Sequence, residues 1–331
     1  MLQYEANSYE EISKLLWMEK HGNLNFHHNQ IIIETPSRKR TNLVEHIEKA
    51  ISDDVKSLVV RESSIIANDN RLFVHVTVGN NVSKIDIWHN NHGGKHSHYE
   101  EFVAKISKNY HILEGYVKWI YDSYNSDIIV SLDSDTEPLE EMYPFLNGKT
   151  VNEYYDSFLD SRSSILLLIG PPGTGKTTFI KGLIQYSKEI ARVCYDDALL
   201  SKDGIFSDFI DSSDTFFILE DADSFLTSRK EGNTMMHKFL NVGDGLIKTR
   251  HKKMIFSTNI PSLKDVDSAL IRPGRCFDIL KFDLLNSDEA RILAKKIGSS
   301  FVIEDGKSYS AAEIFNSQNN STAVNRPVGF I

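Results

Sequence analysis

The chain has 331 residues, of which 40% are hydrophobic and 25% are charged, and its net charge at pH 7 is -9. This is ordinary globular composition, and the length suffices for two domains. Residues 1–150 carry -7 of this charge and residues 151–331 carry -2, so a broad nucleic-acid-binding surface is not indicated.

Membrane and secretory classes are also disfavoured. The longest apolar runs have about five residues, whereas about 18 are needed to span a bilayer. The first residues lack the basic and apolar segments of a secretory signal. Two cysteines, Cys194 and Cys276, cannot form a disulfide framework. We therefore expect a cytoplasmic protein with no membrane span.

Residues 1–135 combine helical and strand-like patterns. An amphipathic stretch at 9–20 and a helical pattern at 99–107 flank β-like runs at 30–34, 57–61, 71–78 and 84–89. The mixture predicts a small α+β domain, which we expect to hold a substrate or partner. The segment 133–138 is acidic and poor in apolar residues, as linkers often are, and we place the domain boundary there.

The rest of the chain alternates strand and helix. Buried-type strands are indicated at 165–169, 190–194, 215–219, 254–257 and 279–282, with helix-compatible stretches between them. This alternation predicts an α/β core with a parallel sheet over residues 139–285. Residues 286–331 contain helix-like stretches at 287–297 and 310–315, which predict a short helical lid and a C-terminal tail.

A glycine-rich loop follows the first strand of this core. Glycines at 170, 173 and 175 let the backbone curl around a phosphate with its N–H groups pointing inward. Lys176 is placed to reach the β and γ phosphates, and Thr177 offers its hydroxyl to Mg2+ at the start of a helix. The sequence therefore predicts a nucleotide-phosphate site formed by Gly170, Pro171, Pro172, Gly173, Thr174, Gly175, Lys176, Thr177 and Thr178.

Polar residues directly follow two other predicted strands of the core. Glu220 and Asp221 follow the apolar run 216–219, so that one carboxylate can serve Mg2+ and the other can orient the attacking water. Asn259 follows the strand at 254–257, and its amide can bridge the γ-phosphate and the water. Asn259 is therefore a candidate catalytic residue, and Thr177 is a candidate metal ligand together with one of the two carboxylates.

Two arginines complete the candidate site. Arg272 and Arg275 surround a Pro-Gly pair, which forms a rigid turn that can present planar donors to a phosphate. An arginine supplied by another subunit can stabilise charge on a transferred phosphoryl group. The alternative is a structural pairing of these arginines with Asp278.

In this order and spacing, the motifs resemble those of AAA+ ATPases of the AAA clade, and the resemblance covers about residues 139–300. The order Glu220-Asp221, where most members have Asp-Glu, is similar to the mitochondrial Rieske-protein translocase subfamily and to related tailed-phage ATPases. The resemblance implies ATP and Mg2+ as cofactors. By position in the family motif, Glu220 would serve as a metal ligand with Thr177, and Asp221 would be the catalytic residue that positions the water. It also implies a homo-oligomeric ring, usually a hexamer, in which Arg272 and Arg275 act in trans on the neighbouring subunit's site.

This resemblance favours ATP hydrolysis coupled to remodelling or translocation of a protein partner. Two alternatives remain: a nucleic-acid-associated ATPase of the loader or helicase type, and a nucleotide-gated scaffold with weak turnover. Whether the ring is hexameric or heptameric is also open.

Two local features have two interpretations each. Phe206 follows the second core strand, where family members carry an aromatic pore loop, and it is equally compatible with the core of the following helix. The basic stretch 248–253 could be a nucleic-acid strip, and a solvated loop is favoured.

Overall fold

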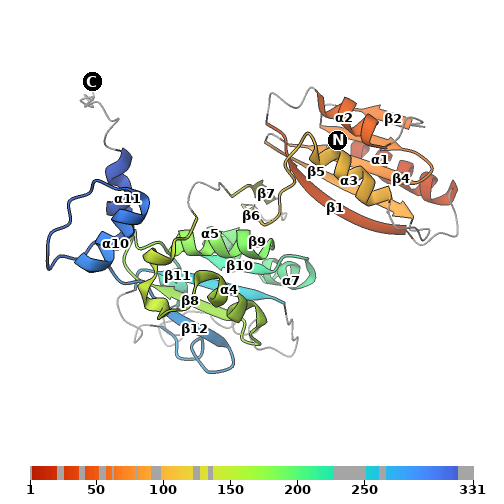
Figure 1. The fold of residues 1–331 in the computed structure, drawn as a ribbon. Coiled ribbons are helices and arrows are strands. Elements are labelled where there is room, and N and C mark those ends of the chain that lie inside the picture. Colours follow the sequence, from red (N-terminus) through yellow and green to blue (C-terminus); the bar gives the residue numbers. More distant parts are fainter. Residues whose placement is uncertain are drawn as a thin grey trace, which may run out of the picture. The chain divides into compact units, whose positions relative to one another are not determined.

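The computed structural model describes residues 2–20, 26–36, 42–51, 57–61, 63–79, 81–90, 98–121, 127–132, 137–226, 251–260 and 266–319 (Figure 1). The chain divides into two compact units, Met1–Glu114 and Gly115–Ile331. Each unit has its own buried core and is described by itself.

The first unit is a five-stranded antiparallel sheet in the order β1-β5-β4-β3-β2. Its strands are β1 (Phe26–Glu34), β2 (Ser57–Val60), β3 (Ser64–Asn68), β4 (Leu72–Val78) and β5 (Val82–Asn90). The prediction of a small α+β domain is thus confirmed over residues 2–114, within the ranges given above.

Helices cover both faces of this sheet. Helices α2 (Leu43–Ile51) and α3 (His98–Ser107) pack on one face, in a core that includes Ile65. Helix α1 (Leu2–Lys20) packs on the other through Trp17, which is buried with Ile66. Successive side chains of a strand point to opposite faces, so adjacent isoleucines of β3 serve the two cores.

The second unit contains a seven-stranded sheet in the order β12-β8-β11-β10-β9-β6-β7. The five predicted strands are present and parallel: β8 (Ile165–Ile169), β9 (Ile190–Cys194), β10 (Phe216–Leu219), β11 (Lys253–Thr258) and β12 (Cys276–Lys281). The predicted α/β class is therefore confirmed. Ligands of such sheets bind beyond the carboxyl ends of the strands.

The predicted boundary at 133–138 is wrong. Strands β6 (Tyr116–Ile120) and β7 (Asp127–Val130) belong to the second unit, because β6 pairs in parallel with β9 and β7 pairs antiparallel with β6. The units meet in sequence at Glu114 and Gly115. The sequence pattern predicts no strand in either range and leaves both inside residues 1–135, because strands this short give little local signal.

Helices cover both faces of the larger sheet as well. One core joins Leu166 and Leu168 of β8 to α4 (Val151–Asp160) and α5 (Lys176–Ser187). The other joins Leu167 to α6 (Asp197–Leu200), α7 (Gly204–Asp211) and α8 (Asp223–Leu226). Alternate residues of one apolar strand thus fill both layers, as expected for a strand buried on both faces.

The lid is also present. It contains α10 (Ser287–Ile297) and α11 (Ala311–Asn319), and α10 packs on the short 3-10 helix η2 (Glu140–Met142). Asn286 and Glu289 form a reciprocal capping box at the start of α10, which satisfies backbone N–H groups that the helix leaves open. The predicted C-terminal tail from residue 320 onward lies outside the described residues.

The structure decides between the two interpretations of Phe206. Phe206 is 5% exposed and stacks on Phe217 of β10 with ring centroids 5.4 Å apart, so it belongs to the core.

The solvated-loop interpretation of residues 248–253 is wrong at its end. Lys252 and Lys253 are buried, 8% and 2% exposed, where β11 enters the sheet. Residues 248–250 lie outside the described ranges.

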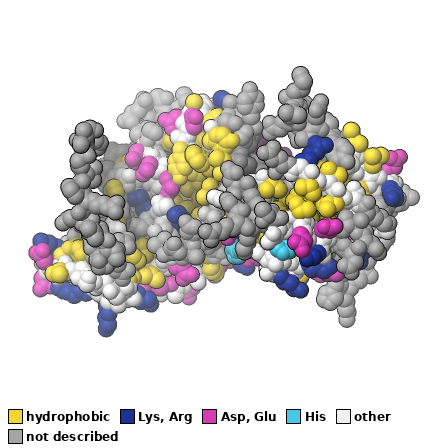
Figure 2. Space-filling view, turned by 90° about the horizontal axis from the view of Figure 1, so that it is seen from above, with side chains coloured by type: hydrophobic (Ala, Val, Ile, Leu, Met, Phe, Trp, Pro, Cys, Tyr) yellow, Lys and Arg dark blue, Asp and Glu magenta, His cyan; other side chains and the backbone are white. Residues whose placement is uncertain are grey.

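On the described part of the face drawn in Figure 2, small groups of Lys and Arg side chains and of Asp and Glu side chains both occur beside hydrophobic patches. Among the described helices, none is both long enough and apolar enough to cross a membrane.

Candidate nucleotide-binding site

The glycine-rich loop lies between the end of β8 and the start of α5, at the carboxyl edge of the sheet. Gly173 and Gly175 have φ angles of +79° and +94°, which side chains disfavour. At Gly170 a Cβ atom would lie 2.1 Å from the carbonyl oxygen of Phe282. The loop can therefore run this close to β12 only because residue 170 is glycine.

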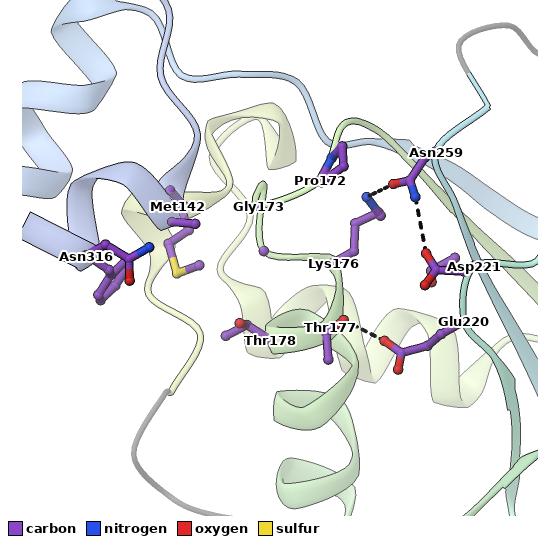
Figure 3. A pocket seen from close by; sticks show the side chains of 15 residues that line it. Met142, Pro172, Gly173, Lys176, Thr177, Thr178, Glu220, Asp221, Asn259 and Asn316 are labelled. Carbon is purple, nitrogen blue, oxygen red and sulfur yellow. Dashed lines mark hydrogen bonds between the residues drawn. The ribbon is translucent and has the colours of Figure 1, made fainter. Parts of the chain in front are cut away.

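Lys176 is the central cation of the loop (Figure 3). Its Nζ donates to the carbonyl oxygens of Gly170 at 2.6 Å and Pro171 at 2.9 Å, and to Asn259 Oδ1 at 2.9 Å. Burial lowers the pKa of Lys176, and the nearby carboxylates, Asp221 foremost, oppose that shift. A partly buried ammonium group at the first position of a helix suits a phosphate anion.

Glu220 and Thr177, the two predicted metal ligands, are hydrogen-bonded to each other. Thr177 Oγ1 donates to Glu220 Oε1 at 2.5 Å, and the hydroxyl oxygen keeps lone pairs for a cation. Among the described residues, no group of three or more His, Cys, Asp or Glu side chains could hold a metal ion. Hard oxygen donors in small number fit Mg2+, which takes one or two protein ligands together with phosphates and water. Thr177 and Glu220 would hold that ion.

The Asn259 side chain is hydrogen-bonded to both Lys176 and Asp221. While its Oδ1 accepts from Lys176, its Nδ2 donates to Asp221 Oδ1 at 3.2 Å, so one amide connects the cation of the loop with the exposed carboxylate (Figure 3). Asp221 has a φ angle of +48°. Asp tolerates this left-handed conformation better than most side chains, which gives a physical reason for the shorter acid at this position.

Sequence reasoning missed Asp223 as a site residue. Its Oδ1 accepts from the Thr258 hydroxyl and from the Asn259 backbone N–H, the latter at 3.0 Å. Asp223 thereby fixes the end of β11 that carries Asn259. The only available signal was its place two residues after Asp221.

Tyr195 was missed as well. Its hydroxyl donates to Glu220 Oε2 at 3.2 Å. Burial, followed by the negative charge of Glu220, raises the pKa of Tyr195 to about 12, so the hydroxyl stays protonated at neutral pH. No motif marks this residue, which is the first after β9.

These residues line a cavity of about 450 Å3. The cavity has a polar end at the loop and the acidic pair, and an apolar end formed by η2 and the lid helix α11. Its lining is Met142, Pro172, Gly173, Gly175, Lys176, Thr177, Thr178, Glu220, Asp221, Ser257, Asn259, Ala311, Ala312, Phe315 and Asn316. A nucleotide has the same two characters, a charged phosphate chain and a flat, mostly apolar base.

Three predicted loop residues are not part of this lining. Thr174 is buried and its hydroxyl donates to the carbonyl oxygen of Pro171 at 2.9 Å, which shapes the loop from within. Gly170 provides the close approach to Phe282. The lid also contacts the loop directly, because Ala312 N donates to Gly173 O at 3.0 Å.

The two arginines lie elsewhere. Neither Arg272 nor Arg275 lines the cavity. Arg272 is exposed, whereas Arg275 is half-buried and its Nη1 donates to the carbonyl oxygen of Ala269 at 3.2 Å. Asp278, their alternative partner, accepts from the Tyr154 hydroxyl at 3.0 Å.

Comparison with known proteins gives the same assignment for the core. Residues 166–284 match the ATPase family associated with various cellular activities (AAA). A 26S proteasome regulatory subunit 6B homolog of Encephalitozoon cuniculi (strain GB-M1) is 25% identical over 158 residues, which are 42% of this chain and 40% of that protein.

Two further relatives match over similar lengths. The subunit 6B homolog of Dictyostelium discoideum is 26% identical over 158 residues, 42% of this chain and 38% of that protein. The 26S proteasome regulatory subunit 8 of Caenorhabditis elegans is 26% identical over 140 residues, which are 37% of this chain and 33% of that protein. The matches thus span two fifths or less of each relative's length. With its phosphate loop, parallel sheet and acidic strand end, the second unit of this chain contains a AAA ATPase domain.

Proposed function

We propose that this chain hydrolyses ATP and uses the reaction to remodel or move a protein partner. The hydrogen-bonded series Lys176–Asn259–Asp221 carries the hydrolysis proposal, because it joins a phosphate-binding cation to a carboxylate at one end of the cavity. The similarity to proteasome regulatory subunits supports a protein as the partner.

Each side chain has one task in this proposal. Lys176 and the loop N–H groups bind and orient the phosphates, and Asn259 holds the γ-phosphate and water in line. Asp221 orients the water and accepts its proton. Thr177 and Glu220 hold Mg2+, which when bound neutralises charge on the phosphates.

The order Glu220-Asp221 supports placing the chain near the Rieske-protein translocase subfamily and the related phage ATPases. The first unit, residues 1–114, is the candidate partner-binding part, and its separate core supports an independent role. Mixed surface charge on the described face in Figure 2 favours a protein partner over a nucleic acid.

Asp221→Asn tests the hydrolytic assignment. Asn tolerates the left-handed backbone at least as well as Asp, so the variant removes the negative charge without straining the turn. We expect unchanged binding of a fluorescent ATP analogue and phosphate release lowered by about two orders of magnitude, the effect of losing about 3 kcal/mol of transition-state stabilisation. The exposed Asp211→Asn on α7 is the matched control. Turnover at the wild-type rate in Asp221→Asn would exclude this role.

We further propose that several copies of this chain form a ring, as is usual for the family, and that Arg272 of each subunit completes the nucleotide site of its neighbour. Its exposure supports this role, and a heterologous closed interface provides the geometry. Arg272→Ala subunits should bind nucleotide and fail to hydrolyse it.

Mixing two inactive variants tests the trans arrangement. In a mixture with Asp221→Asn, the Arg272→Ala sites receive an intact arginine from their neighbours, and phosphate release should reappear. Hydrolysis by pure Arg272→Ala at the wild-type rate, or a mixture that stays inactive, would contradict action in trans.

A further inference from the structure

Glu220 has a hydrogen-bond donor on each of its two carboxylate oxygens. Thr177 Oγ1 donates to Oε1 at 2.5 Å, and Tyr195 OH donates to Oε2 at 3.2 Å. A single donor would leave the carboxylate free to rotate, whereas two donors from different elements, α5 and the end of β9, fix its plane. Tyr195 is therefore the part of this arrangement that no phosphate-binding motif supplies.

The ring of Tyr195 is held from the edge hairpin of the sheet. Trp119 of β6 meets it edge to face, with ring centroids 6.5 Å apart, and the Tyr121 ring centroid lies 6.2 Å from that of Trp119. Tyr195 and Trp119 also line a second cavity of about 200 Å3, formed mostly by apolar side chains of β6, β7, β9 and α5. Thr177 and Glu220 lie at the boundary that this cavity shares with the nucleotide site.

We propose that Tyr195 is a positioning residue that holds Glu220 in the orientation in which it receives Mg2+, and that hairpin β6–β7 positions Tyr195 through Trp119. The proposal rests on the proposed nucleotide site. It predicts that the metal affinity of the site depends on a hairpin that contains none of the phosphate-binding motifs.

The test measures metal binding rather than turnover. Tyr195→Phe keeps the ring against Trp119 and removes only the donor to Glu220. A fluorescent ATP analogue is bound at increasing Mg2+ concentration and, separately, in EDTA. We expect the Mg2+ concentration at half-maximal effect to rise about tenfold, the lower end for residues that orient metal ligands. Affinity in EDTA should stay at the wild-type value, which also shows that the variant is folded.

Tyr186→Phe is the matched control, because the Tyr186 hydroxyl donates to Asp156 at 2.8 Å, outside both cavities. It should leave the Mg2+ midpoint unchanged. Trp119→Ala should raise the midpoint in the same direction as Tyr195→Phe and by a smaller factor.

The outcomes separate this proposal from the one on which it rests. If Tyr195→Phe has the same Mg2+ midpoint as Tyr186→Phe, the positioning role is overturned while the nucleotide site stands. A normal midpoint in Trp119→Ala overturns the role of the hairpin. Absence of Mg2+-dependent nucleotide binding in the wild-type protein overturns the proposed function and this inference together.

Discussion

Asp223 offers a test of how the end of β11 is positioned. Two donors, the Thr258 hydroxyl and the Asn259 backbone N–H, converge on the same oxygen, Asp223 Oδ1. Replacing Asp223 by Ala removes both hydrogen bonds. Asn259 then loses the contact that holds its backbone, and its amide no longer has a fixed position between Lys176 and Asp221.

The magnitude follows from the burial of the partners. A hydrogen bond to a charged group contributes about 1.5–3 kcal/mol. The Thr258 side chain is fully buried and finds no water to replace Asp223, whereas Asn259 is exposed and finds one. We therefore take about 3 kcal/mol for the pair. Were all of it needed to hold Asn259 in the reactive arrangement, its loss would lower the hydrolysis rate by about two orders of magnitude, which is the upper limit of the expected effect.

The assay compares Asp223→Ala with Asp223→Asn. Asn keeps an Oδ1 acceptor for both donors and removes only the charge, so it should retain most of the steady-state phosphate release. Asp223→Ala should lose it while still binding a fluorescent ATP analogue. Equal loss in both variants would show that the charge of Asp223 matters rather than its acceptor. Wild-type turnover in Asp223→Ala would refute the positioning argument altogether.

Three further predictions concern stability. Asp214 is fully buried and accepts from Lys and Arg side chains of two other strands, so Asp214→Ala should lower the free energy of unfolding by about 3–5 kcal/mol in urea titrations; a loss below about 1 kcal/mol would contradict the importance of this ion network. Burial lowers the pKa of Lys253 to about 8 from 10.5, so the folded state binds this proton less tightly than the unfolded state and stability rises with pH between these values. Relative to Lys253→Met, the free energy of unfolding of the wild-type protein should rise by up to about 3 kcal/mol between pH 7 and pH 10. If the difference in unfolding free energy between the two proteins did not change with pH, Lys253 would not titrate in this range. Gly170→Ala places a Cβ atom 2.1 Å from the Phe282 carbonyl oxygen. It should lower the free energy of unfolding by about 1–3 kcal/mol and weaken nucleotide binding. Gly204→Ala, with open space around residue 204, should change neither quantity.

The convergence of the candidate residues on one cavity was largely predictable, because these residues follow strands and loops that are recognisable locally. The glycines of the phosphate loop, Lys176 and the acidic pair each stand at the end of an apolar run, and parallel strands bring such ends to one edge. Asp223 and Tyr195 were not predictable, since their importance lies in the partners they meet, and those partners are 25 to 36 residues away in sequence.

Burial and pairing were the other limits of sequence reasoning. Lys253 belongs to a basic stretch, and its position inside the sheet depends on the carbonyl oxygens of Ser161 and Ser163, which accept from its Nζ at 2.6 Å and 3.1 Å. Strands β6 and β7 are only five and four residues long, and neither was predicted from the sequence. Only the parallel ladder between β6 and β9 shows that they belong with the ATPase core.

The position of the unit boundary has a mechanical consequence. The chain passes from the first unit to the second between Glu114 and Gly115, and β6 begins at Tyr116. Tension applied along β6 would shear its ladder with β9, loading all the pairs from Tyr116–Ile190 to Ile120–Cys194 at once instead of peeling them one by one.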